Sequence, residues 1–194
     1  MKDNNMKFVV MGDGLVGKTR LVRTFAYNKP TENVSFPITM GGKKDFYTKS
    51  YGHNGVLTIY DSAGQLELKN PRSDQCKNTD AIILAFSFTN KSSLENITGQ
   101  WLKELQKNKV FGIPIVLVGL GKNEYNSANN NHIDPQINND DIVNQLSSEL
   151  RTTVKYVTCS LQKLEEVKTV FNTARELVSS NEYSHSFIKR IGFC

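Results

Sequence analysis

The sequence contains no long hydrophobic run, since none of its apolar stretches approaches the ~20 consecutive residues that a membrane-spanning helix needs. Its N-terminus is polar and leads directly into a predicted strand, so we expect no secretory signal. Its three cysteines are odd in number and lack the spacing of metal ligands, which indicates a reducing compartment rather than a disulfide framework. The 194 residues therefore predict one soluble domain in the cytoplasm.

The basic residues give little support for a nucleic-acid partner. The net charge of +5 at pH 7 is modest, and the lysines and arginines are dispersed along the chain. They do not alternate with aromatic residues along any stretch, as they do in many nucleic-acid-binding surfaces. We expect the basic residues to form a scattered, solvated surface.

The most informative segment is a glycine-rich turn with the pattern G-x-x-x-x-G-K-[ST], between an apolar β-branched run and an amphipathic run. Its glycines allow backbone N–H groups to surround phosphate oxygens. The Lys18 ammonium can reach the β- and γ-phosphates, and the Thr19 hydroxyl can bind Mg²⁺. A chance match is disfavoured by the strand–loop–helix context. The segment predicts a nucleoside triphosphate site comprising Gly12, Asp13, Gly14, Leu15, Val16, Gly17, Lys18, Thr19 and Arg20.

Apolar runs alternate with helical patterns along the chain, which is typical of an α/β domain with a mostly parallel sheet. Strands are predicted at 7–11, 46–51, 56–60, 81–88, 115–118 and 155–158, and helices at 18–26, 92–107, 142–150 and 165–178. An Asn-Gly pair at 54–55 predicts a hairpin. The Asn-rich stretch 123–141 is predicted to be a surface loop. We expect one domain over 1–178, followed by a polar, mobile tail over 179–194.

Two further segments complete the predicted nucleotide site. Asp61 directly follows a predicted strand and can hold Mg²⁺ through water. In the same segment, Gly64 can bring a backbone N–H to the γ-phosphate and Gln65 can orient the attacking water. Thr39, in the loop before the second strand, can bind Mg²⁺ and sense the γ-phosphate. Loss of that phosphate would release both loops, which predicts an order–disorder switch.

With these motifs the chain resembles the Ras superfamily of small GTPases over about residues 7–178, and its Rho/Rac branch in particular. The branch resemblance rests on residues 86–101, on residues 154–171 and on the Gly-Asp-Gly-x-Val-Gly-Lys-Thr form of the glycine-rich turn. It implies a Ras-like P-loop GTPase fold, with a six-stranded, mostly parallel sheet and helices on both faces. It also implies that GTP and GDP are the ligands, with effectors, an exchange factor and a GTPase-activating protein as partners in signalling and cytoskeletal regulation.

The resemblance assigns roles to individual positions. Lys18, Thr39 and Gln65 would be catalytic, and Thr19, Thr39 and Asp61 would serve Mg²⁺. Gly14 stands where the family needs a small residue so that an arginine finger can approach, and without that finger hydrolysis is ~10³–10⁵-fold slower. The implied function is a slow GTPase switch. Two other interpretations are a nucleotide-binding scaffold that does not cycle and, less favoured, an ATP-using P-loop enzyme.

The guanine-specificity motif [NT]-K-x-D is altered in this chain. Without a gap, Asn123 takes the place of the aspartate and Gly121 that of the lysine. With a one-residue slip, Lys122 and Glu124 restore a lysine–acid spacing, and we favour this slipped register. The second loop that contacts the base would contain Ser160 and Leu161, where the bulky leucine is unusual for the family.

The predicted effector segment and the C-terminus also depart from the family. Residues 40–44 are Met-Gly-Gly-Lys-Lys, where Rho and Rac proteins have an aromatic and an acidic residue. This basic loop predicts partners with an acidic docking face. The sequence ends in Cys194 without the C-a-a-X prenylation pattern. We therefore expect a cytoplasmic protein with weak or no membrane anchoring.

Overall fold

A six-stranded sheet forms the centre of the protein, in the order β2-β3-β1-β4-β5-β6. The computed structural model describes residues 5–30, 46–51, 55–62, 76, 78–125 and 127–191. Among the strands of these residues, β2 and β3 pair antiparallel and the other neighbouring pairs are parallel. The strands are β1 (Met6–Gly12), β2 (Phe46–Tyr51), β3 (Gly55–Asp61), β4 (Ala81–Ser87), β5 (Ile115–Leu120) and β6 (Val154–Cys159).

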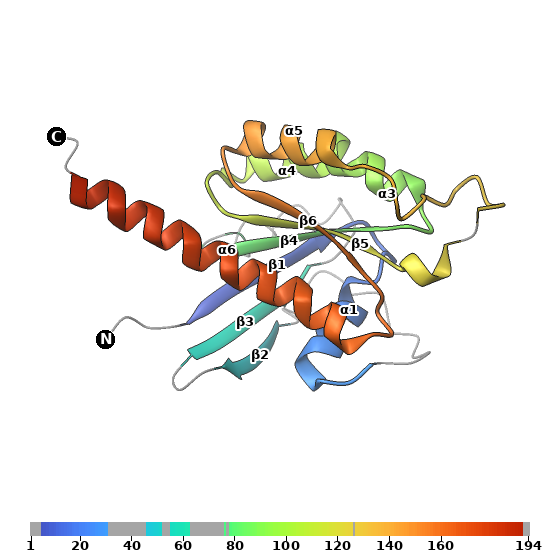
Figure 1. Cartoon of the computed structure of the whole chain (residues 1–194), viewed down its shortest axis with the longest axis horizontal. Coiled ribbons are helices and arrows are strands. Elements are labelled where there is room, and N and C mark those ends of the chain that lie inside the picture. The colour runs from blue at the N-terminus through green and yellow to red at the C-terminus, as the bar shows by residue number, and fades with distance from the viewer. Residues whose placement is uncertain are drawn as a thin grey trace.

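Helices cover both faces of this sheet (Figure 1). On one face lie α1 (Lys18–Tyr27) and α6 (Leu164–Ile191). On the other lie α3 (Lys91–Asn96), a π-turn (Ile97–Trp101), α4 (Leu102–Lys107) and α5 (Asp140–Leu150). The predicted α/β class and the six-stranded, mostly parallel sheet with two helical layers are confirmed.

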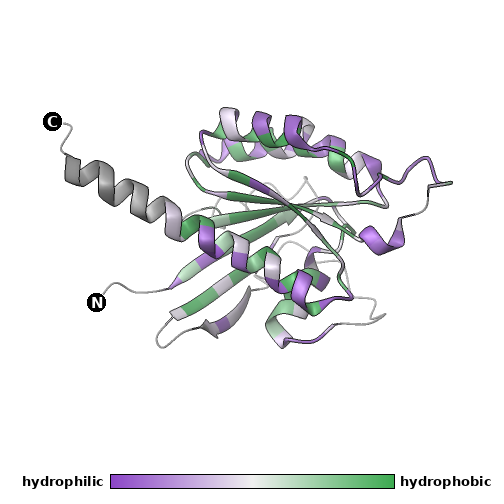
Figure 2. Ribbon diagram, in the orientation of Figure 1, coloured by the Kyte–Doolittle hydropathy of each residue, from purple (hydrophilic) through white to green (hydrophobic). Residues whose placement is uncertain are grey.

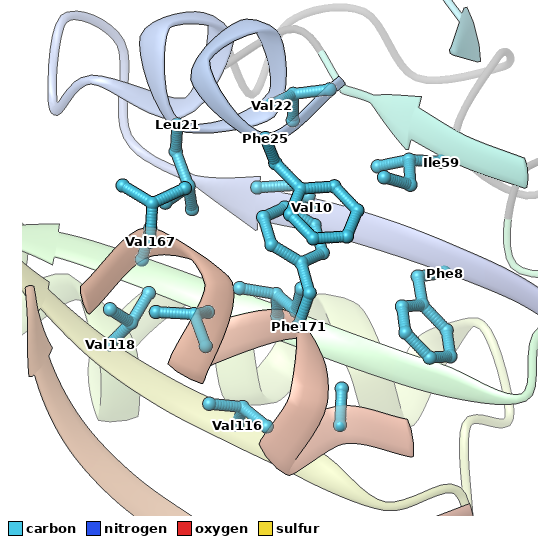
Figure 3. Packing of buried hydrophobic residues seen from close by; sticks show 14 of the residues in the cluster. Phe8, Val10, Leu21, Val22, Phe25, Ile59, Val116, Val118, Val167 and Phe171 are labelled. Atoms are coloured by element: carbon cyan, nitrogen blue, oxygen red, sulfur yellow. The ribbon is translucent and has the colours of Figure 1, made fainter. Parts of the chain in front are cut away.

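Strand β1 separates two hydrophobic cores because its side chains alternate between the faces of the sheet. Phe8 and Val10 belong to the core under α1 and α6, whereas Val9 and Met11 belong to the core under α3, α4 and α5. In the first core, the rings of Phe25 and Phe171 stack with centroids 3.9 Å apart (Figure 3). The central strands are mostly apolar, whereas the helices carry both apolar and hydrophilic residues (Figure 2).

Three larger differences separate the structure from the sequence-based prediction. The helix predicted at 92–107 is interrupted by the π-turn, which contains Gly99. The predicted loop 123–141 ends earlier, because α5 begins at Asp140, and it is not wholly at the surface: the Ile133 side chain is buried and its N–H donates to the Phe88 carbonyl at 2.7 Å. Helix α6 continues to Ile191, beyond the predicted end at 178, because no glycine or proline interrupts this part of the sequence.

No helix within the described residues is both long enough and apolar enough to cross a membrane.

Candidate functional site

The glycine-rich turn lies where β1 ends and α1 begins, so its backbone follows the carboxyl edge of the parallel sheet. Gly12 has φ 137°, and a Cβ there would lie 2.1 Å from the Ala85 carbonyl oxygen of β4. Gly17 has φ 106° and directly precedes α1. Both glycines are therefore required by the backbone of this chain itself. A Cβ on Gly14 would meet no atom within 4 Å, so packing within the described residues does not require this third glycine.

Lys18 is buried at the first position of α1, with 6% of its surface exposed. Its ammonium donates to the Asp13 carbonyl at 2.5 Å and so crosses the turn. The first turn of α1 contains no acidic residue, and its N-cap residue is Gly17, which has no side chain to cap the helix. The first backbone N–H groups of a helix lack intrahelical partners, and this end of the helix dipole is positive. The turn therefore combines a buried cation with a helix N-terminus, an arrangement that suits a phosphate group.

Two oxygen groups lie together beside Lys18. The Thr19 hydroxyl donates to an Asp61 carboxylate oxygen at 2.5 Å, and Asp61 is only 2% exposed at the end of β3. Ser62, the next residue, is held against β1 because its N–H and hydroxyl both donate to the Val10 carbonyl. Oxygen donors of this kind suit Mg²⁺, which uses one or two protein ligands together with phosphate oxygens and water. The predicted metal residues Thr19 and Asp61 thus fit the ion, whereas Thr39, Gly64 and Gln65 lie outside the described residues.

The two loops that follow β5 and β6 meet at one edge of the sheet, because these strands are parallel neighbours. Asn123 donates its side-chain amide N–H to the Ser160 hydroxyl at 2.9 Å. Lys122 and Glu124, the pair favoured from the sequence, contact other residues. The Lys122 ammonium pairs with Glu166 at 2.8 Å, and the Glu124 carboxylate, half exposed, lies 3.9 Å from Arg20. The structure therefore brings Asn123, rather than Glu124, to the Ser160 loop.

Leu161 does not extend into the space beside this loop. Its side chain is 6% exposed and belongs to the core under α1 and α6. A Cβ on Gly17 would lie only 2.9 Å from its Cδ1 atom. The bulky residue that is unusual at this position therefore packs beneath the glycine-rich turn. Two other predicted residues of the turn lie in opposite environments. Val16 is buried, whereas Leu15 is 91% exposed and has φ 64°.

Glu166 holds the Ser160 loop in place, although no sequence motif predicted this role. One of its carboxylate oxygens accepts the Ser160 N–H at 2.9 Å and also pairs with Lys122. Burial alone would raise the pKa of Glu166. The hydrogen bonds from Lys122 and from the Ser160 backbone outweigh burial and hold the pKa of this carboxyl below its usual value. Glu166 is therefore an ionised anchor that fixes the loop to the start of α6.

Asp13 connects the glycine-rich turn to the opposite helical layer, and this too was missed from the sequence. Its carboxylate accepts from the Asn96 amide at 2.7 Å and from the Trp101 indole N–H at 2.6 Å. Trp101 ends the π-turn and is fully buried. π-turns are rare and frequently occur at functional sites. Here the π-turn places the single tryptophan of the chain against the candidate phosphate site.

The chain belongs to the Ras family, because the sequence model of that family matches residues 7–180. It is also similar to the GTP-binding protein RHO4 of Saccharomyces cerevisiae, with 29% identity over 189 residues. This alignment covers 95% of the chain but 61% of the yeast protein. The chain thus spans about three fifths of the length of that relative.

Replacing Glu166 by glutamine is expected to lower the free energy of unfolding at pH 7 by about 1–3 kcal/mol, because an amide cannot replace the charged acceptor of Lys122 and Ser160. Since the pKa of this carboxyl is lowered on folding, its contribution is complete above the usual value of 4.5 and is lost as the pH falls through the folded value. The difference in the free energy of unfolding between wild type and variant should therefore become smaller at acidic pH. Urea denaturation at pH 7 and at lower pH measures it.

Glu165→Gln is the matched control, because Glu165 is the preceding residue but is 82% exposed, and within the described part of the chain its carboxylate pairs with Lys168. Its effect should stay within about 0.5 kcal/mol. Equal effects of the two substitutions, or a difference for Glu166→Gln that does not change with pH, would contradict the role of Glu166.

Proposed function

We propose that this protein is a Rho-like molecular switch that binds GTP and GDP with Mg²⁺ and hydrolyses GTP slowly. The observation that supports it most directly is the convergence of Lys18, Thr19 and Asp61 at the N-terminus of α1. A buried ammonium, a helix N-terminus and two adjacent oxygen donors match the charges of a nucleotide triphosphate and its metal ion. Membership of the Ras family and the similarity to a yeast GTP-binding protein agree with this proposal.

The phosphate end of the site needs little rearrangement in this proposal. The Lys18 ammonium, now on the Asp13 carbonyl, has only to turn toward the β- and γ-phosphates. The Thr19 hydroxyl and the Asp61 carboxylate would hold Mg²⁺, directly and through water respectively. When bound, the ion neutralises phosphate charge and orients the phosphate oxygens. The carboxylate of Asp13 stays occupied by Asn96 and Trp101 and so keeps the turn in place.

Hydrolysis is assigned to Gln65, which would orient the attacking water, and to Thr39, which would complete the metal site. Both assignments come from the sequence. The structure adds one supporting fact: among the described residues, no atom beyond the chain neighbours lies within 4 Å of a Cβ placed on Gly14. That space leaves room for a group supplied by a partner, which agrees with slow hydrolysis that a partner accelerates.

At the base end, we propose the ungapped register, in which Asn123 faces the base, in place of the slipped register favoured from sequence. Asn123 reaches Ser160, and its amide N–H is used there, so its carbonyl oxygen remains as an acceptor. Glu124 is half exposed beside Arg20. One amide oxygen replaces the two oxygens of a carboxylate, which forfeits a charge-assisted contact to the guanine edge. We therefore expect weaker retention of GDP than in relatives with the aspartate.

Asn123→Asp is expected to slow GDP release by about tenfold or more, because a carboxylate restores a charge-assisted hydrogen bond worth ~1.5–3 kcal/mol. Glu124→Gln, the matched control at the next residue, should leave the release rate nearly unchanged. Stopped-flow release of a fluorescent GDP analogue measures both. Unchanged release after Asn123→Asp would contradict the ungapped register, and faster release after Glu124→Gln would restore the slipped one.

Gln65→Leu is expected to reduce single-turnover GTP hydrolysis at least about tenfold, because water is no longer oriented for attack. Affinity for GTP should be nearly unchanged, since Gln65 would contact water rather than nucleotide. Gln136→Leu, the same change at an exposed loop residue, is the control. Lys18→Ala should instead abolish tight binding. Equal turnover in Gln65→Leu and wild type would refute the assignment, and a wild type that binds but never hydrolyses GTP would favour the non-cycling scaffold.

A further inference from the structure

Arg20 lies between the two ends of the proposed nucleotide site. It is the third residue of α1, directly after Lys18 and Thr19 at the phosphate end. Its guanidinium reaches the base end, where the Nη1 atom lies 3.9 Å from a carboxylate oxygen of Glu124. Glu124 is the residue after Asn123. The guanidinium therefore lies beside the loop that the proposed function assigns to the base.

The Arg20 side chain is largely enclosed, with 21% of its surface exposed. Its Nε atom is buried and has no hydrogen-bond partner among the described residues. Buried donors without a partner are rare in folded proteins because they destabilise the native state. An arginine that served only as a surface charge would keep this nitrogen in water. The enclosed Nε–H therefore indicates a role in binding rather than in solvation.

The contact with Glu124 holds this guanidinium only weakly. At 3.9 Å the two atoms are too far apart for a hydrogen bond, and the Glu124 side chain is 52% exposed to water. Exposed ion pairs of this kind contribute little to stability. The guanidinium can therefore leave this carboxylate for a ligand at small cost.

The loop after β5 has lost one cation and has committed another. In the ungapped register, Gly121 stands where the motif has a lysine, and the Lys122 ammonium pairs with Glu166 at 2.8 Å. A Cβ on Gly121 would lie 3.6 Å from the Glu124 carboxylate, the same group that Arg20 approaches. Arg20 thus brings a cation from α1 to the side of Gly121 on which a longer side chain would begin.

We propose that the Arg20 guanidinium binds the O6 and N7 atoms of the guanine base and so favours guanine over adenine. This proposal rests on the proposed function, because it concerns the same nucleotide. Both O6 and N7 of guanine are acceptors, and a planar guanidinium can donate to the two at once. Adenine keeps N7 but has an amino donor in place of O6, so one of the two hydrogen bonds is lost.

A contact with the phosphates is the other role open to a cation on the first turn of α1. The phosphates already have the Lys18 ammonium and the helix N-terminus, however, and the Arg20 guanidinium lies beside the base loop. The Asn123 carbonyl oxygen is an acceptor and suits the donor edge of guanine. Arg20 and Asn123 would therefore read different edges of the base, and the expectation for Asn123→Asp is unaffected.

The test compares GDP with 7-deaza-GDP, in which a C–H group replaces N7, and with ADP. Dissociation constants are measured by displacement of a fluorescent GDP analogue from the full-length protein, at fixed Mg²⁺ concentration and ionic strength. GDP and 7-deaza-GDP carry the same phosphates, so the ratio of their dissociation constants reports on the base alone. In the wild type we expect 7-deaza-GDP to bind about tenfold or more weakly, because it loses a hydrogen bond to a charged donor.

The test variant is Arg20→Met, which keeps an unbranched side chain but removes every donor. The ratio for 7-deaza-GDP and GDP should fall below about twofold, and the preference for GDP over ADP should fall at least about tenfold. The control is Lys29→Met, which removes the same charge from an exposed position just beyond the other end of α1. Both ratios should stay within about twofold of wild type in the control. Thermal melting verifies that both variants fold, and Arg20→Ala replaces Arg20→Met if that protein does not.

Two results would overturn the proposal while leaving the proposed function intact. The first is a wild type that binds GDP and 7-deaza-GDP equally well. The second is an Arg20→Met variant that keeps both wild-type ratios, and an equal loss of affinity for all three nucleotides would then assign Arg20 to the phosphates. A wild type that binds neither GDP nor its analogues would instead overturn the proposed function, and this proposal with it.

Discussion

The arrangement of the whole site depends on one buried cation, Lys18, at the junction of β1 and α1. A buried ammonium is costly unless hydrogen-bonded or paired with opposite charge. Its position on the Asp13 carbonyl satisfies part of that requirement within the chain. The rest of the local structure keeps the turn fixed around it: Gly12 allows the turn to pack on β4, and Asp13 is tied to Asn96 and Trp101. Binding of a phosphate would place negative charge beside this ammonium, at a turn whose backbone is already in position.

The base end of the proposed site is held by contacts centred on Glu166. Glu166 fixes the Ser160 backbone and Lys122 together, so a lysine that could have covered a base is committed to an ion pair. The adjacent Cys159 is buried, and this burial, followed by the charge of Glu166, raises the pKa of its thiol to about 12. The thiol therefore stays neutral beside the loop and takes no part in charge recognition. In the proposed nucleotide site, the group that the loops after β5 and β6 leave to recognise the base would be the amide of Asn123, which donates to Ser160.

Much of the fold could be predicted from sequence because its signals are local. Strands β4 and β5 are buried on both faces and so read as continuous apolar runs, and the glycine-rich turn has a fixed spacing. The full length of α6 could also have been predicted, since no glycine or proline occurs between its start and Gly192. Apolar periodicity alone missed this signal because residues 179–186 are mostly polar.

The missed parts of the site are contacts between distant segments. Asn123 and Ser160 are 37 positions apart and meet only because β5 and β6 are neighbours in the sheet. Trp101 and Asp13 are 88 positions apart and meet through a π-turn, which a search at the α-helical period of 3.6 residues does not detect. The same limit applies to the choice between Asn123 and Glu124, because either residue fits the motif when spacing alone is considered.

The central claim is that the buried Lys18 site holds a guanine nucleotide. Its most direct test is the identity of the nucleotide that remains bound after gentle purification in the presence of Mg²⁺, read by chromatography of the denatured protein. We expect GDP or GTP in a substantial fraction of the molecules and little adenine nucleotide. Adenine nucleotide in place of guanine nucleotide, or no bound nucleotide together with no binding of added GTP or GDP, would contradict it.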